Sequence, residues 1–345
     1  MKTEAIVLRK HGGPEVLVRE TIELPDPGPR EVRIRVRAVA LNHLDLWVRR
    51  GMPNLKLEYP HRLGADVTGE VDALGPGARG VEVGQRVVVN PGVTCGVCER
   101  CLSGQDNLCR RYAILGEHTH GGYARHLNVP DTNLLPYPGD RSFTEIAAVP
   151  LVFLTAWQMV VDKARVRPGQ TVLVQAAGSG VSSAAIQIAK LHGARVFATA
   201  GSDLKVERAR ALGADEVINY KTHDFVDEVK RLTGKRGVDV VIEHVGGDVM
   251  TKSVLATTSG GRIVTCGATA GSQPKIDLLH VFYRQIEILG STMGSKGSLF
   301  TILEHVKAGT LKPVVDRVLP LWDAVEAHRA LESRDAFGKI VLEVD

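Results

Sequence analysis

Four of the five cysteines lie within fifteen residues and follow the spacing C-x2-C-x2-C-x7-C. Clustered thiols usually bind a metal ion, and four thiolates can close a tetrahedron around Zn²⁺ in a structural site. A ferredoxin-like run has a shorter last gap and a following proline, which this segment lacks. Four unrelated buried thiols are the alternative. The spacing predicts one structural zinc ion, bound by Cys95, Cys98, Cys101 and Cys109.

A Gly/Ser turn lies between an apolar segment at 171–175 and a segment of helical periodicity at 181–192. A helix N-terminus offers free N–H groups and a partial positive charge to a pyrophosphate, and small residues let the backbone approach it. Two glycines match the dinucleotide-binding fingerprint, although a serine, Ser183, stands at its third position. A glycine-rich turn in any α/β protein could look the same. The residues assigned to the pyrophosphate are Gly178, Ser179, Gly180 and Val181.

The next apolar segment ends in small neutral residues, where an NAD site usually has an acid for the ribose 2′-hydroxyl. Ser202 and Lys205 follow, and both suit a 2′-phosphate. The alternative is that Lys205 lies on a solvated helix face. We expect NADPH rather than NADH. The remaining residues assigned to the cofactor are Thr155, Tyr220 and Gly267.

Strands and helices alternate between residues 150 and 294, which is typical of a doubly wound parallel sheet that binds a dinucleotide. The expected strands are 171–175, 195–199, 216–219, 238–243, 262–266 and 286–289, and the expected helices are 181–192, 203–212, 225–233 and 248–258. The phosphate-binding turn follows the first strand, and ligands bind beyond the carboxyl ends of such strands.

Residues 1–149 contain short segments rich in Val and Ile, separated by Pro and Gly, which predict an antiparallel β domain. The expected strands are 5–9, 16–22, 31–40, 63–74 and 86–90, and the zinc lobe spans 92–111. Residues 295–345 are too few for a core of their own. We therefore expect them to return and complete the first domain.

The chain has 345 residues, which is enough for two domains. Its net charge of +4 is too small to indicate a surface that binds nucleic acid. It has no apolar run long enough to span a membrane and no signal-peptide core. These features predict a cytoplasmic protein without nucleic-acid or membrane partners.

Taken together, these segments resemble the medium-chain dehydrogenase/reductase superfamily nearly end to end. The motifs that carry the resemblance are PHRLGADVTG at 60–69, GGYA at 121–124, LGAD at 212–215 and GKIVL at 338–342. The resemblance implies an α/β protein with a β-rich, GroES-like catalytic domain at 1–149 and 295–345. It also implies a Rossmann NAD(P)-binding domain at 150–294, hydride transfer to or from a nicotinamide, and a homodimer or homotetramer.

The zinc alcohol dehydrogenases of this family bind a catalytic zinc through a Cys, the His of a Gly-His-Glu motif, and a later Cys or Asp. Here the corresponding positions hold Asn42, then Gly64-Ala65-Asp66, then no ligand at 150–154. The Asn-His-Leu-Asp segment at 42–45 resembles the zinc-independent quinone oxidoreductase branch. The alternative is a rebuilt zinc site that uses the histidines of the same domain, His43, His61, His118 and His120.

Without a Lewis acid, hydride transfer favours acceptors that spread negative charge, such as quinones and α,β-unsaturated carbonyls, for which hydrogen-bond donors suffice. The catalytic candidates are Asn42, Asp45 and Asp66. We expect the Asn42 amide to polarise the acceptor oxygen, although a turn role is open, as is a capping role for Asp45. The leading hypothesis is an NADPH-dependent quinone or enone reductase. The alternatives are an alcohol or aldehyde dehydrogenase with unusual ligands and a non-catalytic nucleotide sensor.

Overall fold

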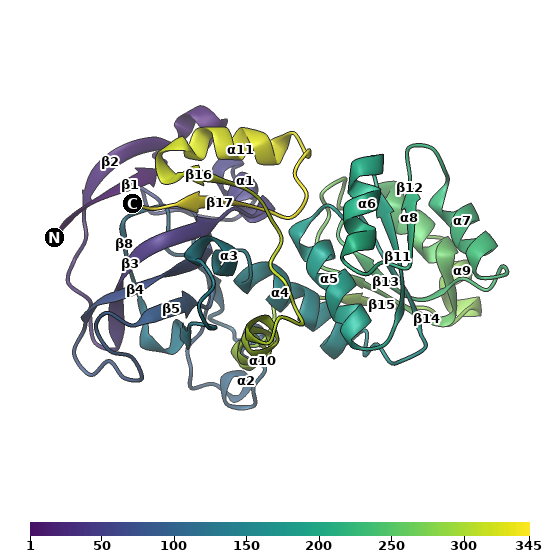
Figure 1. The fold of residues 1–345 in the computed structure, drawn as a ribbon, viewed down its shortest axis with the longest axis horizontal. Helices are drawn as coiled ribbons and strands as arrows, with labels where there is room; N and C mark the ends of the chain where they lie inside the picture. Colours follow the sequence, from purple (N-terminus) through teal and green to yellow (C-terminus); the bar gives the residue numbers. More distant parts are fainter. The chain divides into compact units, whose positions relative to one another are not determined.

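The computed structural model describes residues 1–345, which divide into two compact units (Figure 1). Unit 1 comprises Met1–Leu151 and Ser295–Asp345, and unit 2 comprises Val152–Gly294. No helix in either unit combines the length and the apolar character needed to cross a bilayer.

Unit 1 is built on a seven-stranded sheet in the order β16-β17-β3-β4-β5-β9, with β8 also paired to β3. Its strands are β3 (Glu31–Ala40), β4 (Asp66–Leu74), β5 (Arg86–Val89), β8 (His126–Pro130), β9 (Leu134–Pro136), β16 (Val315–Pro320) and β17 (Lys339–Glu343). The strand β17 runs antiparallel to β3, with Val341 opposite Ala40, so the last strand of the chain lies beside a strand formed by residues 31–40 (Figure 1). The C-terminal segment therefore belongs to the same unit as the N-terminal residues.

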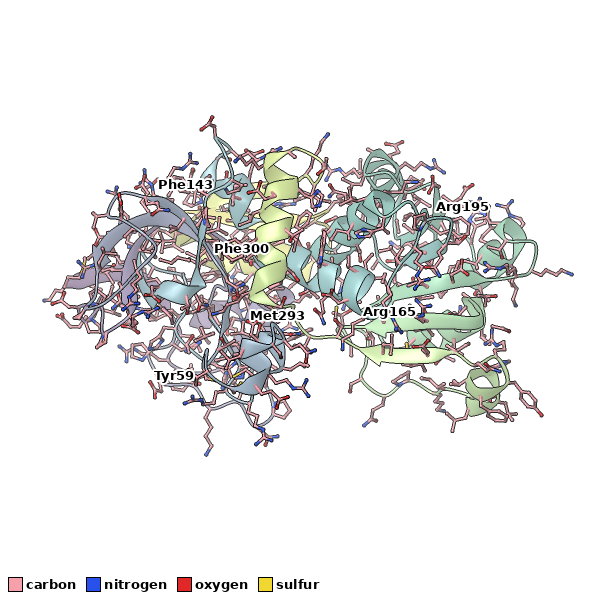
Figure 2. The ribbon with its side chains drawn as sticks, turned by 90° about the horizontal axis from the view of Figure 1, so that it is seen from below. Tyr59, Phe143, Arg165, Arg195, Met293 and Phe300 are labelled. Carbon is pink, nitrogen blue, oxygen red and sulfur yellow. The ribbon has the colours of Figure 1, made fainter.

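Smaller elements surround this sheet. They are β1 (Lys2–Val7), β2 (Val18–Glu23), α1 (His43–Arg50), β6 (Gly92–Val93), α2 (Glu99–Leu102), β7 (Ala113–Ile114), α3 (Phe143–Ala147), α10 (Lys296–Lys307) and α11 (Ala324–Glu332). At the start of α3, the ring of Phe143 (Figure 2) lies 4.7 Å from the guanidinium of Arg86. The Phe143 carbonyl also accepts a hydrogen bond of 2.9 Å from Thr68 Oγ1. These contacts hold α3 against β4 and β5.

The expected strand at 63–74 begins late, at Asp66. Gly64 has a φ of +96°, a conformation that L side chains rarely adopt. A Cβ there would lie 2.5 Å from the ring of Tyr123, so the backbone turns at the only residue type that fits. The turn aims the amide of Gly64 at Asp45 and lets Asp66 start the strand, which positions two of the catalytic candidates.

Unit 2 contains six parallel strands in the order β12-β11-β10-β13-β14-β15. They are β10 (Thr171–Val174), β11 (Arg195–Ala200), β12 (Glu216–Asn219), β13 (Val238–Glu243), β14 (Thr257–Thr265) and β15 (Glu287–Gly290). The helices are α4 (Pro150–Trp157, begun in unit 1), α5 (Gly180–Leu191), α6 (Asp203–Ala211), α7 (Phe225–Leu232), α8 (Gly247–Ala256) and α9 (Leu278–Tyr283). Every residue of β10 is buried, as expected for a strand covered on both faces. This strand order confirms the predicted doubly wound sheet.

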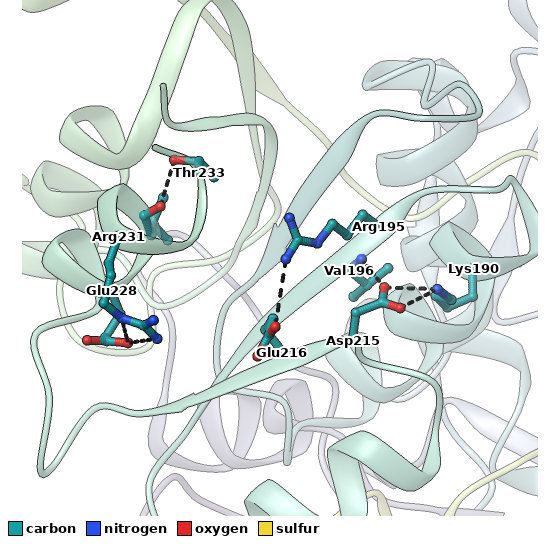
Figure 3. Close-up of polar contacts among 9 residues, drawn as sticks. Lys190, Arg195, Val196, Asp215, Glu216, Glu228, Arg231 and Thr233 are labelled. Carbon is teal, nitrogen blue, oxygen red and sulfur yellow. Dashed lines mark hydrogen bonds and ion pairs between the residues drawn. The ribbon is translucent and has the colours of Figure 1, made fainter. Parts of the chain in front are cut away.

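The Leu-Gly-Ala-Asp motif fastens α5 to the second strand (Figure 3). The carboxylate of Asp215 accepts a 2.6 Å hydrogen bond from the N–H of Val196 and forms an ion pair of 2.8 Å with Lys190 Nζ. Beside it, Arg195 and Glu216 pair at 3.7 Å across β11 and β12. These contacts fix the beginning of β11, the strand whose other end leads to Ser202.

Candidate functional site

The four clustered cysteines converge in unit 1 around the short helix α2. Their Sγ atoms all lie within 4.8 Å of one another. The Cys98–Cys101, Cys98–Cys109 and Cys95–Cys101 separations are 3.5, 3.8 and 3.8 Å. A tetrahedron with metal–sulfur bonds of about 2.3 Å has sulfur–sulfur edges of about 3.8 Å. The cluster therefore has the dimensions of a closed ZnS₄ site.

Backbone N–H groups favour the thiolate form of Cys95 and Cys109 by lowering their pKa, whereas burial raises the pKa of Cys101 to about 11. The N–H groups of Val97 and Cys98 lower the pKa of Cys95 to about 5. The N–H of Arg111 lies 3.3 Å from Cys109 Sγ. Because a metal ion binds the thiolate form, these donors prepare the sulfurs for Zn²⁺. The hollow beside the cysteines is also lined by Arg100, Arg110 and Arg111, whose charges oppose that of four thiolates.

Protein purified without added metal should contain about one zinc ion per chain, measured by elemental analysis, since one closed site has four ligands. The variant Cys109→Ser should lose this ion and melt at a lower temperature, because metal binding contributes to folding. The matched variant Cys266→Ser, whose thiol lies in unit 2, should keep it. A ratio near two would contradict the assignment of a single structural ion.

The three catalytic candidates lie together in unit 1, joined by a lysine that the sequence analysis did not single out. Lys339 Nζ donates to Asn42 Oδ1 at 2.5 Å and to Asp66 Oδ2 at 2.9 Å. Asn42 Nδ2 donates to the same oxygen of Asp66 at 2.9 Å. The other oxygen of Asp66 accepts from the N–H of Leu151 at 2.6 Å. Lys339 is 4% exposed and Asp66 is 0%, so this is a buried ion pair with an amide attached to it.

Asp45 holds the loop that carries Asn42. Its carboxylate accepts from the N–H of Asn42 at 2.7 Å and from the N–H of Gly64 at 2.9 Å. Asn42 is the N-cap of α1 and Asp45 is the third helical residue, so this is one half of a capping box. Burial raises the pKa of Asp45 to about 6, although both hydrogen bonds oppose that shift. The capping role considered for Asp45 is therefore present, as support for Asn42.

The four histidines proposed as replacement ligands do not converge. His61 Nε2 lies 3.1 Å from the carbonyl oxygen of Gly116, and His118 Nδ1 accepts from the N–H of Ile114. In the whole chain, only the cysteine cluster brings three or more potential metal ligands of the His, Cys, Asp and Glu types within reach of one ion.

The Gly/Ser turn of unit 2 has the form expected of a phosphate-binding turn. Ser179 is the N-cap of α5 and accepts from the N–H of Ser182 at 3.1 Å. Gly180 and Val181 form the first turn, where N–H groups have no partner within the helix. These donors fit a pyrophosphate, so the turn could hold the nucleotide that the sequence predicts.

A histidine that the sequence analysis missed braces this turn from β13. His244 Nε2 lies 2.8 Å from Ser182 Oγ and 3.1 Å from Ser179 Oγ. Ser182 gives its own proton to the carbonyl of Gln175, so the histidine must be the donor at Nε2. Burial lowers the pKa of His244 to about 4, which keeps the ring neutral. The sequence signal for His244 was the polar pair Glu243-His244 directly after an apolar strand, at the end of the sheet where ligands bind.

The other cofactor candidates lie near the carboxyl ends of the strands or on α4. Ser202 caps α6 by accepting from the N–H of Lys205, and Gly201 lies so close to Tyr220 that a Cβ would be 2.4 Å from its hydroxyl. Asp203 accepts from the side chain of Asn219, which occupies one of its carboxylate oxygens. Gly267 follows β14, and Thr155 lies on α4, with Oγ1 4.0 Å from the sulfur of Met293 (Figure 2).

Comparison with known proteins agrees with this geometry. Residues 28–139 match the family model of the alcohol dehydrogenase GroES-like domain, and residues 180–308 match that of zinc-binding dehydrogenases. A 2-haloacrylate reductase from Burkholderia sp is 30% identical, with 98% of each chain covered. The human quinone oxidoreductase is 28% identical, with 98% of this chain and 97% of the relative covered.

A crystal structure described as an NAD-dependent alcohol dehydrogenase is 59% identical and superposes with a TM-score of 0.96, covering 99% of this chain and 100% of the other. The β-rich and Rossmann units, the cysteine cluster and the matched families all agree with the resemblance read from the sequence. The chain belongs to the medium-chain, zinc-binding dehydrogenase superfamily and is an NAD(P)-dependent oxidoreductase.

Proposed function

We propose that this enzyme reduces quinones or α,β-unsaturated carbonyl compounds with NADPH and without a catalytic metal ion. The observation that carries the proposal is the buried group of Asn42, Asp66 and Lys339, in which Asn42 stands at the position of one expected zinc ligand. The ammonium of Lys339 already balances the charge of the Asp66 carboxylate. The three side chains thus offer the amide of Asn42 as a donor to a substrate, and they offer no thiol or imidazole to a metal ion.

The neighbours of Asn42 fix the direction of its amide. A lysine ammonium can only donate and an ionised carboxylate can only accept, so Oδ1 faces Lys339 and Nδ2 faces Asp66. One N–H of Nδ2 is used by Asp66, and the second has no partner in the protein. We propose that this second N–H donates to the oxygen of the substrate.

The reduced nicotinamide supplies a hydride when it is bound. A quinone or enone that accepts it gathers negative charge on its oxygen, and a donor already held in place stabilises that charge. Asn42 is such a donor, because the capping contact from Asp45 and the contacts from Asp66 and Lys339 immobilise it. An isolated alkoxide needs stronger stabilisation, which a metal ion usually supplies.

The end of β11 supports the choice of NADPH. Lys205 lies in the first turn of α6, after Ser202, and β11 does not end in a carboxylate. Lys205→Ala should weaken NADPH binding by about 10-fold or more, since a charge-assisted hydrogen bond contributes about 1.5–3 kcal/mol. NADH binding should stay unchanged, and so should the NADPH affinity of the control Lys230→Ala on α7. Equal affinity of the wild type for both cofactors, measured by fluorescence titration, would contradict this role.

An alcohol dehydrogenase is the second candidate, favoured by the 59% identical structure described as NAD-dependent alcohol dehydrogenase. Parallel assays decide between the two. We expect turnover of a simple quinone or enone with NADPH, and little oxidation of primary alcohols with NAD⁺ or NADP⁺. Faster alcohol oxidation together with two metal ions per chain would favour the second candidate. Tight nucleotide binding with no turnover would favour a sensor.

We also propose a homodimer or homotetramer. The short helix α9 exposes apolar side chains, and the neighbouring β15 is an edge strand of the sheet with Ile288 39% exposed. The exposed side chains of α9 are Leu278, Leu279, Phe282 and Tyr283. Such a patch on an edge strand suits a protein interface. Sedimentation velocity should show a species of at least two chains, and a monomer at micromolar concentration would contradict the proposal.

A further inference from the structure

Arg62 is a buried cation without a partner. Its side chain is 5% exposed, and its Nε is fully enclosed without a hydrogen bond. No carboxylate lies within ion-pair distance, and burial lowers the pKa of Arg62 to about 10. A guanidinium carries its charge even then, and an uncompensated buried charge is costly.

Arg49, in the same unit, shows how this fold treats a buried guanidinium that has only a structural role. Arg49 is 0% exposed and pairs with Glu332. It also contacts His328 Nδ1 at 3.1 Å and the carbonyl of Gly12 at 3.2 Å. Every part of that guanidinium is matched by the protein. Arg62 differs because its enclosed Nε has no hydrogen-bond partner in the protein.

The surroundings of Arg62 are donors rather than acids. The Nδ1 of His120 is also buried without a partner, and the His120 ring lies 5.4 Å from that of His61. Burial and the charge of Arg62 lower the pKa of His120 to about 4, so the neutral ring can donate from one nitrogen. The backbone holds the two segments together, because Gly121 donates to the carbonyl of Arg62 at 2.8 Å.

The segment that carries Arg62 is linked to the proposed catalytic amide through Asp45. Two residues after Arg62, the N–H of Gly64 bonds to Asp45, whose carboxylate also holds the backbone of Asn42. An extended segment of two residues spans about 7 Å. The Leu63 side chain between them is packed in the apolar core.

We propose that Arg62, with His120 as a second donor, binds the carboxylate of the substrate, so that the natural acceptor is an unsaturated carbonyl compound bearing a free carboxylate. The proposal rests on the proposed function and narrows its substrate class. The planar guanidinium matches a carboxylate with two parallel hydrogen bonds. In the reaction, the acceptor takes a hydride from the reduced nicotinamide at the carbon β to the ketone and a proton from water at the α carbon. The C=C bond becomes single, and the cofactor is oxidised.

A pair of substrates that differ in one charge tests this. They are 4-oxo-2-pentenoate and its methyl ester, which present the same enone. The wild type should reduce the acid with at least a 10-fold higher kcat/KM. Arg62→Met should raise KM for the acid by about 10–100-fold and change KM for the ester far less, and Arg62→Lys should lie between, since it lacks the bidentate fork. The exposed Arg79→Met serves as the matched control. Equal kinetics of acid and ester in the wild type would overturn the proposal.

A binding measurement separates failure of this proposal from failure of the proposed reaction. The saturated analogue 4-oxopentanoate should bind the wild type in calorimetry, and its affinity should fall at least 10-fold in Arg62→Met even if no enone is reduced. A second titration uses inorganic phosphate. If phosphate bound more tightly than 4-oxopentanoate and its binding depended on Arg62, the carboxylate assignment would be overturned. Arg62→Met should melt at the same temperature or higher, because it removes an unpaired buried charge. A clear loss of stability would mean that Arg62 is structural.

Discussion

Replacing Asn42 with alanine should slow hydride transfer to a quinone or enone by about 10²–10³, the usual cost of removing one preorganised donor. The affinity for NADPH should stay nearly unchanged, because the residues assigned to the nucleotide lie in unit 2 and Asn42 lies in unit 1. Single-turnover stopped-flow measurements, which follow the loss of reduced nicotinamide, separate the chemical step from cofactor binding.

Two further variants separate donation from helix capping. Asn42→Ser keeps a side-chain oxygen that can cap α1, but its short hydroxyl does not replace the amide N–H offered to the substrate. It should therefore be as slow as the alanine variant while melting closer to the wild type. Asn128→Ala removes an amide on β8 of the same unit and should leave the rate unchanged. Unaltered hydride transfer in both Asn42 variants would mean that Asn42 only caps α1, and the donor would have to be another group.

Much of the Rossmann unit could be predicted because its strands are short apolar runs between turn residues, and the helices α5, α6, α7 and α9 each begin after a Ser or Asp cap. The strand at 216–219 and the strand at 238–243 match the expected bounds residue by residue. The cysteine cluster was also predictable, since its ligands are close in the sequence and their spacing alone defines the site.

The polar group around Asn42 was only half predictable. Asn42, Asp45 and Asp66 are within 24 residues of one another, and their positions in a known motif identified them. Lys339 is 297 residues from Asn42 and reaches it only because β17 pairs with β3 in one register. Sequence periodicity does not specify which distant strands become neighbours, so a lysine at the start of the last strand carried no signal of its own.

The charge of Lys339 should matter as much to stability as to catalysis. Lys339→Met leaves Asp66 buried without its counter-charge, and removing one partner of a buried pair usually costs about 3–5 kcal/mol. The free energy of unfolding, measured in urea, should fall by about that amount. Combining Lys339→Met with Asp66→Asn removes both charges and should recover much of the loss. If the double variant is no more stable than Lys339→Met, the ion pair is not what the lysine contributes.

The effect of Lys339 on the rate should pass through Asn42. Without the ammonium on Oδ1, the amide can rotate, and its free N–H is no longer fixed toward the acceptor. Lys339→Met should therefore slow hydride transfer in the wild type but have little further effect in Asn42→Ala, a strong coupling between contacting residues. Lys339→Arg, which can still donate to both oxygens, should restore part of the rate. Full additivity of the two substitutions in stopped-flow rates would show that the lysine acts on the reaction without the amide, as a cation close to the acceptor.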